Sequence, residues 1–233
     1  LVFGANYTNE DPVWAKDRAL TRYSAGPNHI EDSLSATGPW GRFTSNDQTY
    51  ILNHTGSFDG RGVGADSRNI ANYHNEITTD DYYNSVDQMM LQQSSRNKSI
   101  FTTGSYNLTD SLTFKSTAMY SERDSNRQIA GYPLQASSQP QFPVAISGTS
   151  YYNPFGQDIN SWFRRTVELP RTTESNVKTL HFDAALEGVF DVGSHGWNWD
   201  VGFNYNKYDV TQVSRGNINL LALQKALGPS FLN

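Results

Sequence analysis

Arginine and aromatic side chains in two polar stretches are the residues of this sequence best suited to hold a ligand. Guanidinium groups bind anions through charge and paired hydrogen bonds, and aromatic rings stack on aryl groups. The expected ligand is therefore an anionic, aryl-bearing small molecule. The candidate contacts are Trp40, Arg42, Tyr151, Tyr152, Phe155, Arg164 and Arg165. Packing against loop neighbours is the alternative for each side chain, and the proline and glycine of "YYNPFG" favour a structural turn there.

The sequence offers no pattern for catalysis or for a resident metal. It contains no G-x-S-x-G, H-E-x-x-H or Walker motif, and its histidines lack metal-ligand spacing. Asp59, Asp66 and Asn69 could hold Ca²⁺ together with loop carbonyls, although a solvated polar loop is the favoured interpretation. We therefore expect a protein that is not an enzyme and uses no cofactor.

Alternating residues predict the elements that must position the candidate contacts. In "HGWNWDVGFNYNKYD" (195–209), every second residue from Trp197 to Tyr205 is apolar or aromatic, and the residues between them are polar or glycine. This period of two is typical of a strand. The same alternation runs through "LVFGANYT" (1–8), "SIFTTGSYNLTDSLTFKSTAMYSERD" (99–124) and "VKTLHFDAALEGVF" (177–190). Roughly five strands follow, with short turns at "NLTDS" and "DVGSHG".

Two long polar segments separate these strands, at about Asn9–Asn97 and Arg123–Arg171. We expect both to be loops without regular structure. In an antiparallel meander the short turns and the long loops fall on opposite ends. Outer-membrane barrels have this asymmetry, with short periplasmic turns and long extracellular loops. The segment "INLLALQKALGPS" near residue 220 predicts a short amphipathic helix that ends before Gly228-Pro229.

The apolar side of these strands could contact lipid or a protein core. From Trp197 to Tyr205 the strand rises about 26 Å, or about 20 Å after a tilt near 40°, close to the apolar band of an outer-membrane barrel. Asp183, Glu187 and Asp200 share the other side, which suits a polar lumen. A soluble sandwich would show the same alternation. The turn asymmetry and the aromatic positions favour the barrel.

The composition narrows the class of protein further. The chain has 233 residues, 36% hydrophobic and 13% aromatic, with no cysteine and a net charge of -5. The absence of cysteine suits a cytosolic or bacterial surface protein. Lysine and arginine are scattered, so we expect no nucleic-acid partner. No run of apolar residues approaches the 18 or so that a transmembrane helix requires.

Several fragments, in this order, resemble the barrel of large TonB-dependent receptors and span nearly the whole chain. They are "VFGANYTNEDPVWAKDR", "NKSIFTTGSYNLTDSLTFKSTAMYSERDS", "YYNPFG", "RRTVELPRTTESNVKTLHFDAALEG", "WNWDVGFNYNKYD" and "ALGPSF". The resemblance implies an all-β fold, an antiparallel meander forming part of a 22-stranded transmembrane barrel. It also implies an N-terminal plug domain and a TonB box, neither of which we find, nor a terminal aromatic strand. Residues 1–233 would then be a partial barrel that cannot close by itself.

The resemblance also implies a function and a location. The expected protein is an active transporter of the bacterial outer membrane that imports a ferric siderophore or a cobalamin-like nutrient with energy from the TonB complex. Its partners would be outer-membrane lipid, the plug domain of the full-length chain, the TonB complex and the nutrient. The alternative is a soluble or surface-anchored β-sandwich that binds a small ligand or a glycan.

Overall fold

The computed structural model describes residues 1–57, 59, 62–136 and 144–230. It is mostly antiparallel β structure, with 53% strand and 11% helix. The chain divides into two compact units. The sheet unit contains Leu1–Pro12, Gln93–Arg127 and Thr173–Val213, and the insert unit contains Val13–Gln92, Gln128–Thr172 and Ser214–Asn233.

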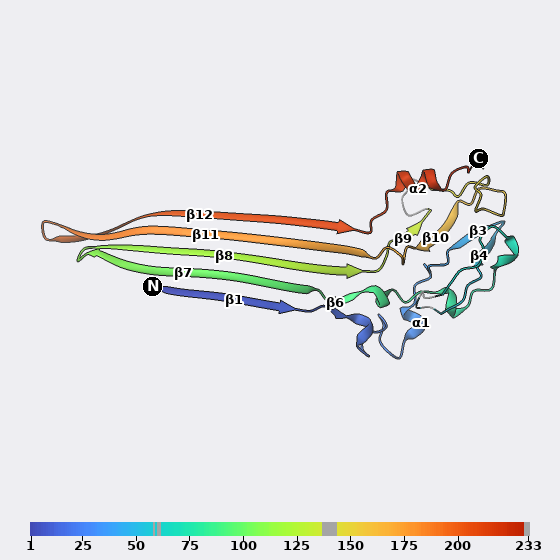
Figure 1. Cartoon of the computed structure of the whole chain (residues 1–233), viewed down its shortest axis with the longest axis horizontal. Helices are drawn as coiled ribbons and strands as arrows, with labels where there is room; N and C mark the ends of the chain where they lie inside the picture. The colour runs from blue at the N-terminus through green and yellow to red at the C-terminus, as the bar shows by residue number, and fades with distance from the viewer. Residues whose placement is uncertain (58, 60–61, 137–143, 231–233) are drawn as a thin grey trace. The chain divides into compact units, whose positions relative to one another are not determined.

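The sheet unit is a five-stranded sheet of long strands in the order β1-β7-β8-β11-β12 (Figure 1). The strands are β1 (Val2–Glu10), β7 (Ser94–Thr109), β8 (Leu112–Ile129), β11 (Arg171–Val192) and β12 (His195–Arg215). The order in space is the order along the chain, so the sheet is a meander. This agrees with the five strands that alternation predicts. The sheet is open among the described residues, and a closed 22-stranded barrel is not shown.

Two-residue connections join the hairpins, as the sequence predicts. Asp110–Ser111 links β7 to β8, and Gly193–Ser194 links β11 to β12. Gly193 has φ of 65°, in the left-handed region where glycine avoids the strain that a Cβ atom causes. In a meander both short connections fall at one end of the sheet, and the two long segments leave from the other end (Figure 1).

The expectation that the two long segments lack regular structure is wrong. Strand β7 begins at Ser94, β8 runs to Ile129 and β11 begins at Arg171, so the long strands extend beyond the predicted boundaries. The extensions were missed because their residues are polar on both sides. Residues 58, 60–61 and 137–143 of these segments lie outside the described part of the chain.

The insert unit contains two further sheets, in the orders β5-β4-β3-β10-β9 and β2-β6. Its strands are β2 (Val13–Trp14), β3 (Arg42–Ser45), β4 (Gln48–Leu52), β5 (Tyr73–His74), β6 (Met90–Gln92), β9 (Pro133–Gln135) and β10 (Ser161–Arg165). Its helices are α1 (Ile30–Ser33), α2 (Leu220–Ala226), η1 (Ala15–Asp17), η2 (Ile70–Asn72), η3 (Thr79–Asp81) and η4 (Ser85–Gln88). The strands have two to five residues, too few for alternation to reveal them.

A hydrophobic core stabilises the insert unit. Its buried members are Leu134, Ala136, Val144, Ile159 and Trp162. The Trp162 indole donates a hydrogen bond of 2.8 Å to the Val144 carbonyl, so its buried N–H is satisfied. Leucines of the predicted helix α2 pack against this core. Its N-cap, Asn219, accepts hydrogen bonds from the backbone N–H groups of Leu221 and Ala222, at 3.1 and 3.2 Å.

Among the described residues, no helix combines the length and apolar character that crossing a bilayer demands.

Candidate functional site

Apolar and aromatic side chains gather on one side of the long sheet. Residues directly opposite each other in an antiparallel pair point to the same side. Ala5, Ile100 and Tyr120 are linked in this way across three strands. Tyr106 lies opposite Phe114, and each is an even number of residues from that row, so the pair shares the same side. This side of β1, β7 and β8 is therefore rich in apolar groups.

The same side continues across β11 and β12. Glu122 is two residues from Tyr120 on β8, so its side chain points to the same side of the sheet. The Lys178 ammonium of β11 lies 3.7 Å from the Glu122 carboxylate and is therefore on that side too. Trp199 of β12 covers Gly188 of β11, where a Cβ atom would clash with the Trp199 ring. We call this side the apolar face; its large members are Phe3, Tyr7, Ile100, Tyr106, Phe114, Tyr120, Leu180, Phe182, Phe190, Trp197, Trp199, Val201, Phe203 and Tyr205.

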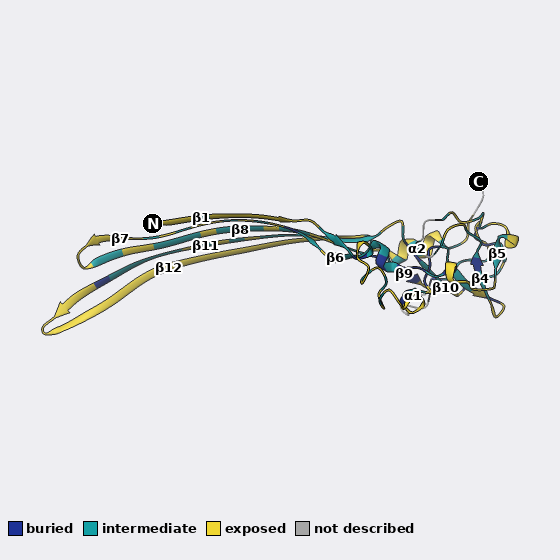
Figure 2. Ribbon diagram, turned by 90° about the horizontal axis from the view of Figure 1, so that it is seen from below, coloured by how far each residue is buried: buried dark blue, intermediate teal, exposed yellow. Residues whose placement is uncertain are grey.

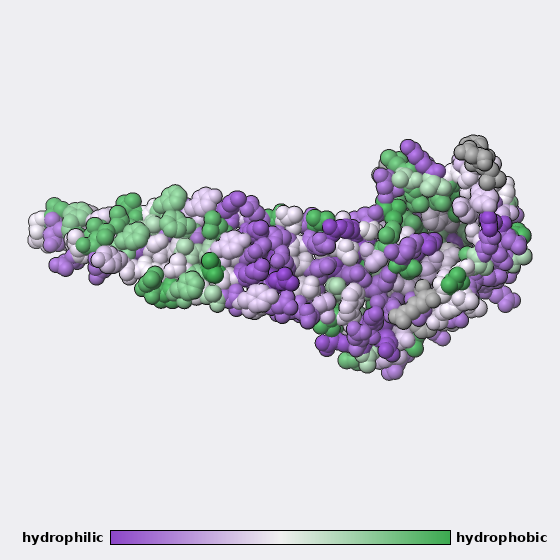
Figure 3. Space-filling view, viewed as in Figure 1, coloured by the Kyte–Doolittle hydropathy of each residue, from purple (hydrophilic) through white to green (hydrophobic). Residues whose placement is uncertain are grey.

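The apolar face is largely uncovered. Trp197, Val201 and Phe203 are 57%, 65% and 61% exposed, and β12 is exposed along its whole length (Figure 2). Figure 3 shows hydrophobic residues gathered over the part of the sheet near the short turns, with hydrophilic residues beyond them. A contiguous exposed apolar surface of this kind marks contact with a membrane or a partner.

The opposite side of the sheet, which we call the polar face, carries a network of hydrogen bonds. His181 contacts Asn206 at 2.6 Å and Asp183 at 3.0 Å through its two ring nitrogens. Lys115 of β8 forms a 2.7 Å ion pair with Glu187 of β11. The sequence places these residues on the side away from the aromatic groups, and the structure confirms that division.

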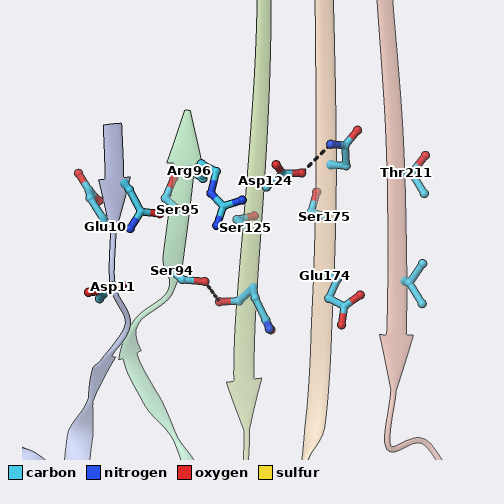
Figure 4. A pocket seen from close by; sticks show the side chains of 14 residues that line it. Glu10, Asp11, Ser94, Ser95, Arg96, Asp124, Ser125, Glu174, Ser175 and Thr211 are labelled. Carbon is cyan, nitrogen blue, oxygen red and sulfur yellow. Dashed lines mark hydrogen bonds between the residues drawn. The ribbon is translucent and has the colours of Figure 1, made fainter. Parts of the chain in front are cut away.

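Farther from the short turns, the side chains on this face of the sheet are mostly polar, and they line an open groove of about 490 Å³ (Figure 4). Arg96 lies opposite Asp124 in this groove. The Asn176 amide donates hydrogen bonds to Asp124 at 2.6 Å and to Glu122 at 3.0 Å. Ligand pockets are mostly apolar and concave, whereas this groove is open and polar. It therefore extends a hydrated surface above the apolar stretch.

Two of the candidate ligand contacts, Trp40 and Arg42, have unsatisfied donors. The Trp40 ring stacks on His54 with ring centres 4.2 Å apart. The Arg42 guanidinium lies 5.2 Å from the centre of the Tyr82 ring and 5.4 Å from that of Phe163. Trp40 Nε1 and Arg42 Nε and Nη2 are buried and have no hydrogen-bond partner in the described part of the protein. Buried donors of this kind are usually satisfied by water or by a ligand.

Tyr151 and Tyr152 form an exposed pair in the insert unit. Their ring centres are 5.1 Å apart in an edge-on arrangement, and Tyr152 is 65% exposed. The Arg68 guanidinium donates a hydrogen bond of 2.5 Å to the Tyr151 hydroxyl and three to the Asp66 carboxylate. These hydrogen bonds from Arg68 lower the pKa of Asp66 to about 2. Arg68 could not be predicted from the sequence as a neighbour of Tyr151, because 83 residues separate the two.

Phe155 is part of the packing of the insert unit. Its ring centre lies 5.0 Å from that of Phe43, 4.8 Å from that of Tyr50 and 5.5 Å from that of Tyr73. The cluster adjoins the hydrophobic core that contains Trp162. Phe155 therefore packs against its neighbours within the protein, which is the alternative to a ligand contact for this residue.

The two neighbouring arginines have different surroundings. Arg164 is partly exposed and forms a 2.7 Å ion pair with Glu168. Arg165 is 9% exposed and donates hydrogen bonds to the carbonyls of Gly131 at 3.0 Å and Thr37 at 3.4 Å. Burial lowers the pKa of Arg165. Its contacts tie three segments of the insert unit together, so its surroundings are those of a structural residue.

A partly buried histidine–aspartate cluster is a feature that the sequence did not reveal. The Nε2 atoms of His54 and His74 lie 3.1 and 3.0 Å from the same Asp81 oxygen, and the other oxygen accepts hydrogen bonds from Thr78. Burial alone raises the pKa of Asp81. The hydrogen bonds from Thr78 and His54 and the charge of His74 outweigh that effect and lower it.

The possible calcium ligands are occupied by protein groups. Asp66 is bonded to Arg68, and the Asn69 side chain accepts a hydrogen bond from the Ala71 backbone. In the described portion of the chain, no three histidine, aspartate or glutamate side chains are arranged to hold a metal ion.

Comparison of this chain with protein-family models, curated proteins and solved structures finds no match.

Proposed function

We propose that this chain is a segment of the barrel of a TonB-dependent receptor in a bacterial outer membrane. The observation that carries the proposal is the exposed apolar face of the sheet unit. Rows of exposed tryptophan, phenylalanine and valine are unfavourable in water and favourable against acyl chains. The polar face suits the interior of a barrel, where water or a plug domain hydrates charged groups.

The dimensions of the sheet support the same proposal. Strand β11 has 22 residues, which at about 3.3 Å per residue is about 73 Å. A tilted strand needs only about 9–11 residues to cross a bilayer. The apolar stretch from Trp197 to Tyr205 matches that length, and Trp and Tyr lie at its two edges as in aromatic girdles. The charged remainder would then extend above the membrane.

Import in this proposal consists of binding and gated translocation without covalent chemistry. The nutrient, a ferric siderophore or a cobalamin-like molecule, would contact the insert unit, and the TonB complex would supply energy through the plug domain. The unsatisfied donors of Trp40 and Arg42 are the best candidates for an anionic group of the nutrient. Arg165 and Phe155 are less suited, because their contacts are already made within the protein.

The alternative is a soluble or surface-anchored β-sandwich that binds a ligand or a glycan. A sandwich buries the apolar side of one sheet beneath a second sheet. Val201 and Phe203 are each more than half exposed, so the alternative has less support from the described residues.

Quenching of tryptophan fluorescence by brominated lipid tests the proposal in the full-length protein reconstituted into bilayers. One variant keeps Trp197 as its only tryptophan, and a matched control keeps only Trp162, which is buried in the insert unit. We expect strong quenching of Trp197 and little quenching of Trp162. Equal, weak quenching of both would show that the apolar face does not contact acyl chains and would refute the proposal.

A further inference from the structure

Three lysines lie where the apolar face meets its charged extension. Lys98 is directly opposite Tyr7 on one neighbouring strand and Glu122 on the other. Lys178 lies beside the same Glu122. The side chain of Asn206 on β12 contacts His181 on β11, and His181 is three residues from Lys178. Lys207, the residue after Asn206, therefore lies at nearly the same height along the sheet as Lys178. We call Lys98, Lys178 and Lys207 the lysine edge.

The lysine edge shares a face with the membrane-contacting residues of the proposed barrel. Counting by twos from Lys98 gives Ile100, and from Lys207 gives Tyr205 and then Phe203. Tyr7 is 63% exposed and Tyr205 is 45% exposed at this level. Tyrosine concentrates where a bilayer meets water, because its ring is apolar and its hydroxyl is polar. The lysine edge therefore has the composition of a headgroup-level surface.

The ammonium groups of the lysine edge retain free hydrogen-bonding capacity. An ammonium has three donors. The Lys98 ammonium makes no hydrogen bond or ion pair with side chains of the described residues, and Lys98 is exposed. Lys178 lies 3.7 Å from Glu122, longer than a strong charge-assisted hydrogen bond, and Glu122 already accepts from Asn176.

The third lysine is similarly available. The Lys207 ammonium is 3.0 Å from Asp209 on its own strand, and both side chains are more than half exposed. An exposed ion pair of this kind contributes little to stability, so a competing anion can exchange for the carboxylate at small cost.

We propose that the lysine edge binds the phosphate of an anionic lipid headgroup whose acyl chains lie along the apolar face. This inference rests on the proposed function, because it requires the apolar face to contact lipid. Phosphate offers several acceptor oxygens to the ammonium groups of Lys178 and Lys207 on the adjacent strands β11 and β12, and Lys98 lies on β7, on the other side of β8. A free phosphate ion would gain only the charge interactions, whereas a lipid also gains burial against Tyr205 and Phe203. A lipid is therefore the occupant that the combined surface favours.

Lipid retention by the full-length protein tests this inference. The protein is reconstituted with equal amounts of phosphatidylglycerol and phosphatidylcholine of the same acyl chains, and the lipids that remain bound are measured by native mass spectrometry. We expect enrichment of phosphatidylglycerol, and a loss of about fivefold in that enrichment for each lysine changed to glutamine. The variants are Lys98→Gln, Lys178→Gln, Lys207→Gln and the triple substitution.

Lys115→Gln is the matched control, because Lys115 lies on the polar face in an ion pair with Glu187. It should leave the enrichment unchanged. Equal enrichment in the triple variant and the Lys115→Gln variant would overturn the inference. Displacement of phosphatidylglycerol by an equal concentration of inorganic phosphate would also overturn it, because it would identify a site for free anions.

Trp197 quenching by brominated lipid, measured on the same samples, separates the two proposals. If Trp197 is quenched but phosphatidylglycerol is not enriched, the lipid-headgroup inference fails and the barrel proposal stands. If Trp197 is not quenched, the barrel proposal fails, and this inference fails with it. Quenching in the triple variant equal to that of the unmodified protein shows that the substitutions leave the fold intact.

Discussion

A lysine at position 203 should destabilise the protein much more than a lysine at position 204. Phe203 lies six residues after Trp197, which is about 20 Å along the strand, or about 15 Å of height at a tilt near 40°. The apolar band of an outer-membrane barrel is about 25 Å tall. Phe203 is therefore close to the middle of the bilayer if Trp197 lies at one interface.

The expected cost follows from that depth. A lysine near the bilayer midplane on the lipid side of a barrel costs about 2–4 kcal/mol. Phe203 is 61% exposed, so the lost protein packing adds little to this value. Asn204 points to the polar face, where water or plug groups can hydrate a lysine, and we expect a cost of about 0.5 kcal/mol or less.

Reversible urea unfolding of the full-length protein in bilayers of two thicknesses measures both costs. For Phe203→Lys the loss of stability should be smaller in the thinner bilayer, because the ammonium reaches the interface more easily. For Asn204→Lys it should not depend on thickness. An equal cost at the two positions would show that the faces of β12 are misassigned. A loss of stability for Phe203→Lys that does not depend on bilayer thickness would show that Phe203 does not contact lipid.

Three further predictions concern packing and charge. Gly188→Ala should cost about 1–3 kcal/mol in unfolding experiments, because its Cβ atom would displace the Trp199 ring; Gly196→Ala, where only the Asp191 side chain is near, is the control. The lowered pKa of Asp81 means that its unfolded form binds protons more readily. The stability that Asp81 contributes should therefore be present near neutral pH and be lost as pH falls below about 3.8. In the Asp81→Asn variant, the free energy of unfolding should depend less on pH in that range. Arg165→Met should cost about 1–3 kcal/mol through unpaired carbonyls, whereas Arg164→Met should be nearly neutral, and equal effects would contradict the structural role of Arg165.

The long strands were predictable from the sequence because one side of each is apolar. The alternation from Trp197 to Tyr205 fixes both the strand and its faces, and the structure has the same division. The turn at Gly193 was equally clear. The alternation fades at Ser94, Ile129 and Arg171, because both sides of the strands are polar there, and the predicted boundaries stopped short.

The insert unit was not predictable in the same way, because its contacts join residues far apart in the sequence. Arg165 meets the Thr37 carbonyl across 128 residues, and His54 meets Asp81 across 27. No short-range pattern in the sequence predicts contacts between residues so far apart. The residue types of Trp40 and Arg42 suit ligand binding, but their unsatisfied donors depend on burial that only the folded chain reveals. Whether they contact a nutrient stays a prediction.

The discontinuous make-up of the insert unit has a consequence for the order in which the protein folds. Its residues come from three separate stretches of the chain, and Leu220 and Leu223 of α2 complete the core that Trp162 and Leu134 begin. Contacts of such high sequence separation form late, since each requires the closure of a long loop. The hairpins of β7 with β8 and of β11 with β12 close over only two residues and can form early. Until residues 220–227 are in place the insert unit therefore exposes an incomplete core, and chaperone binding or proteolysis should concentrate in that interval.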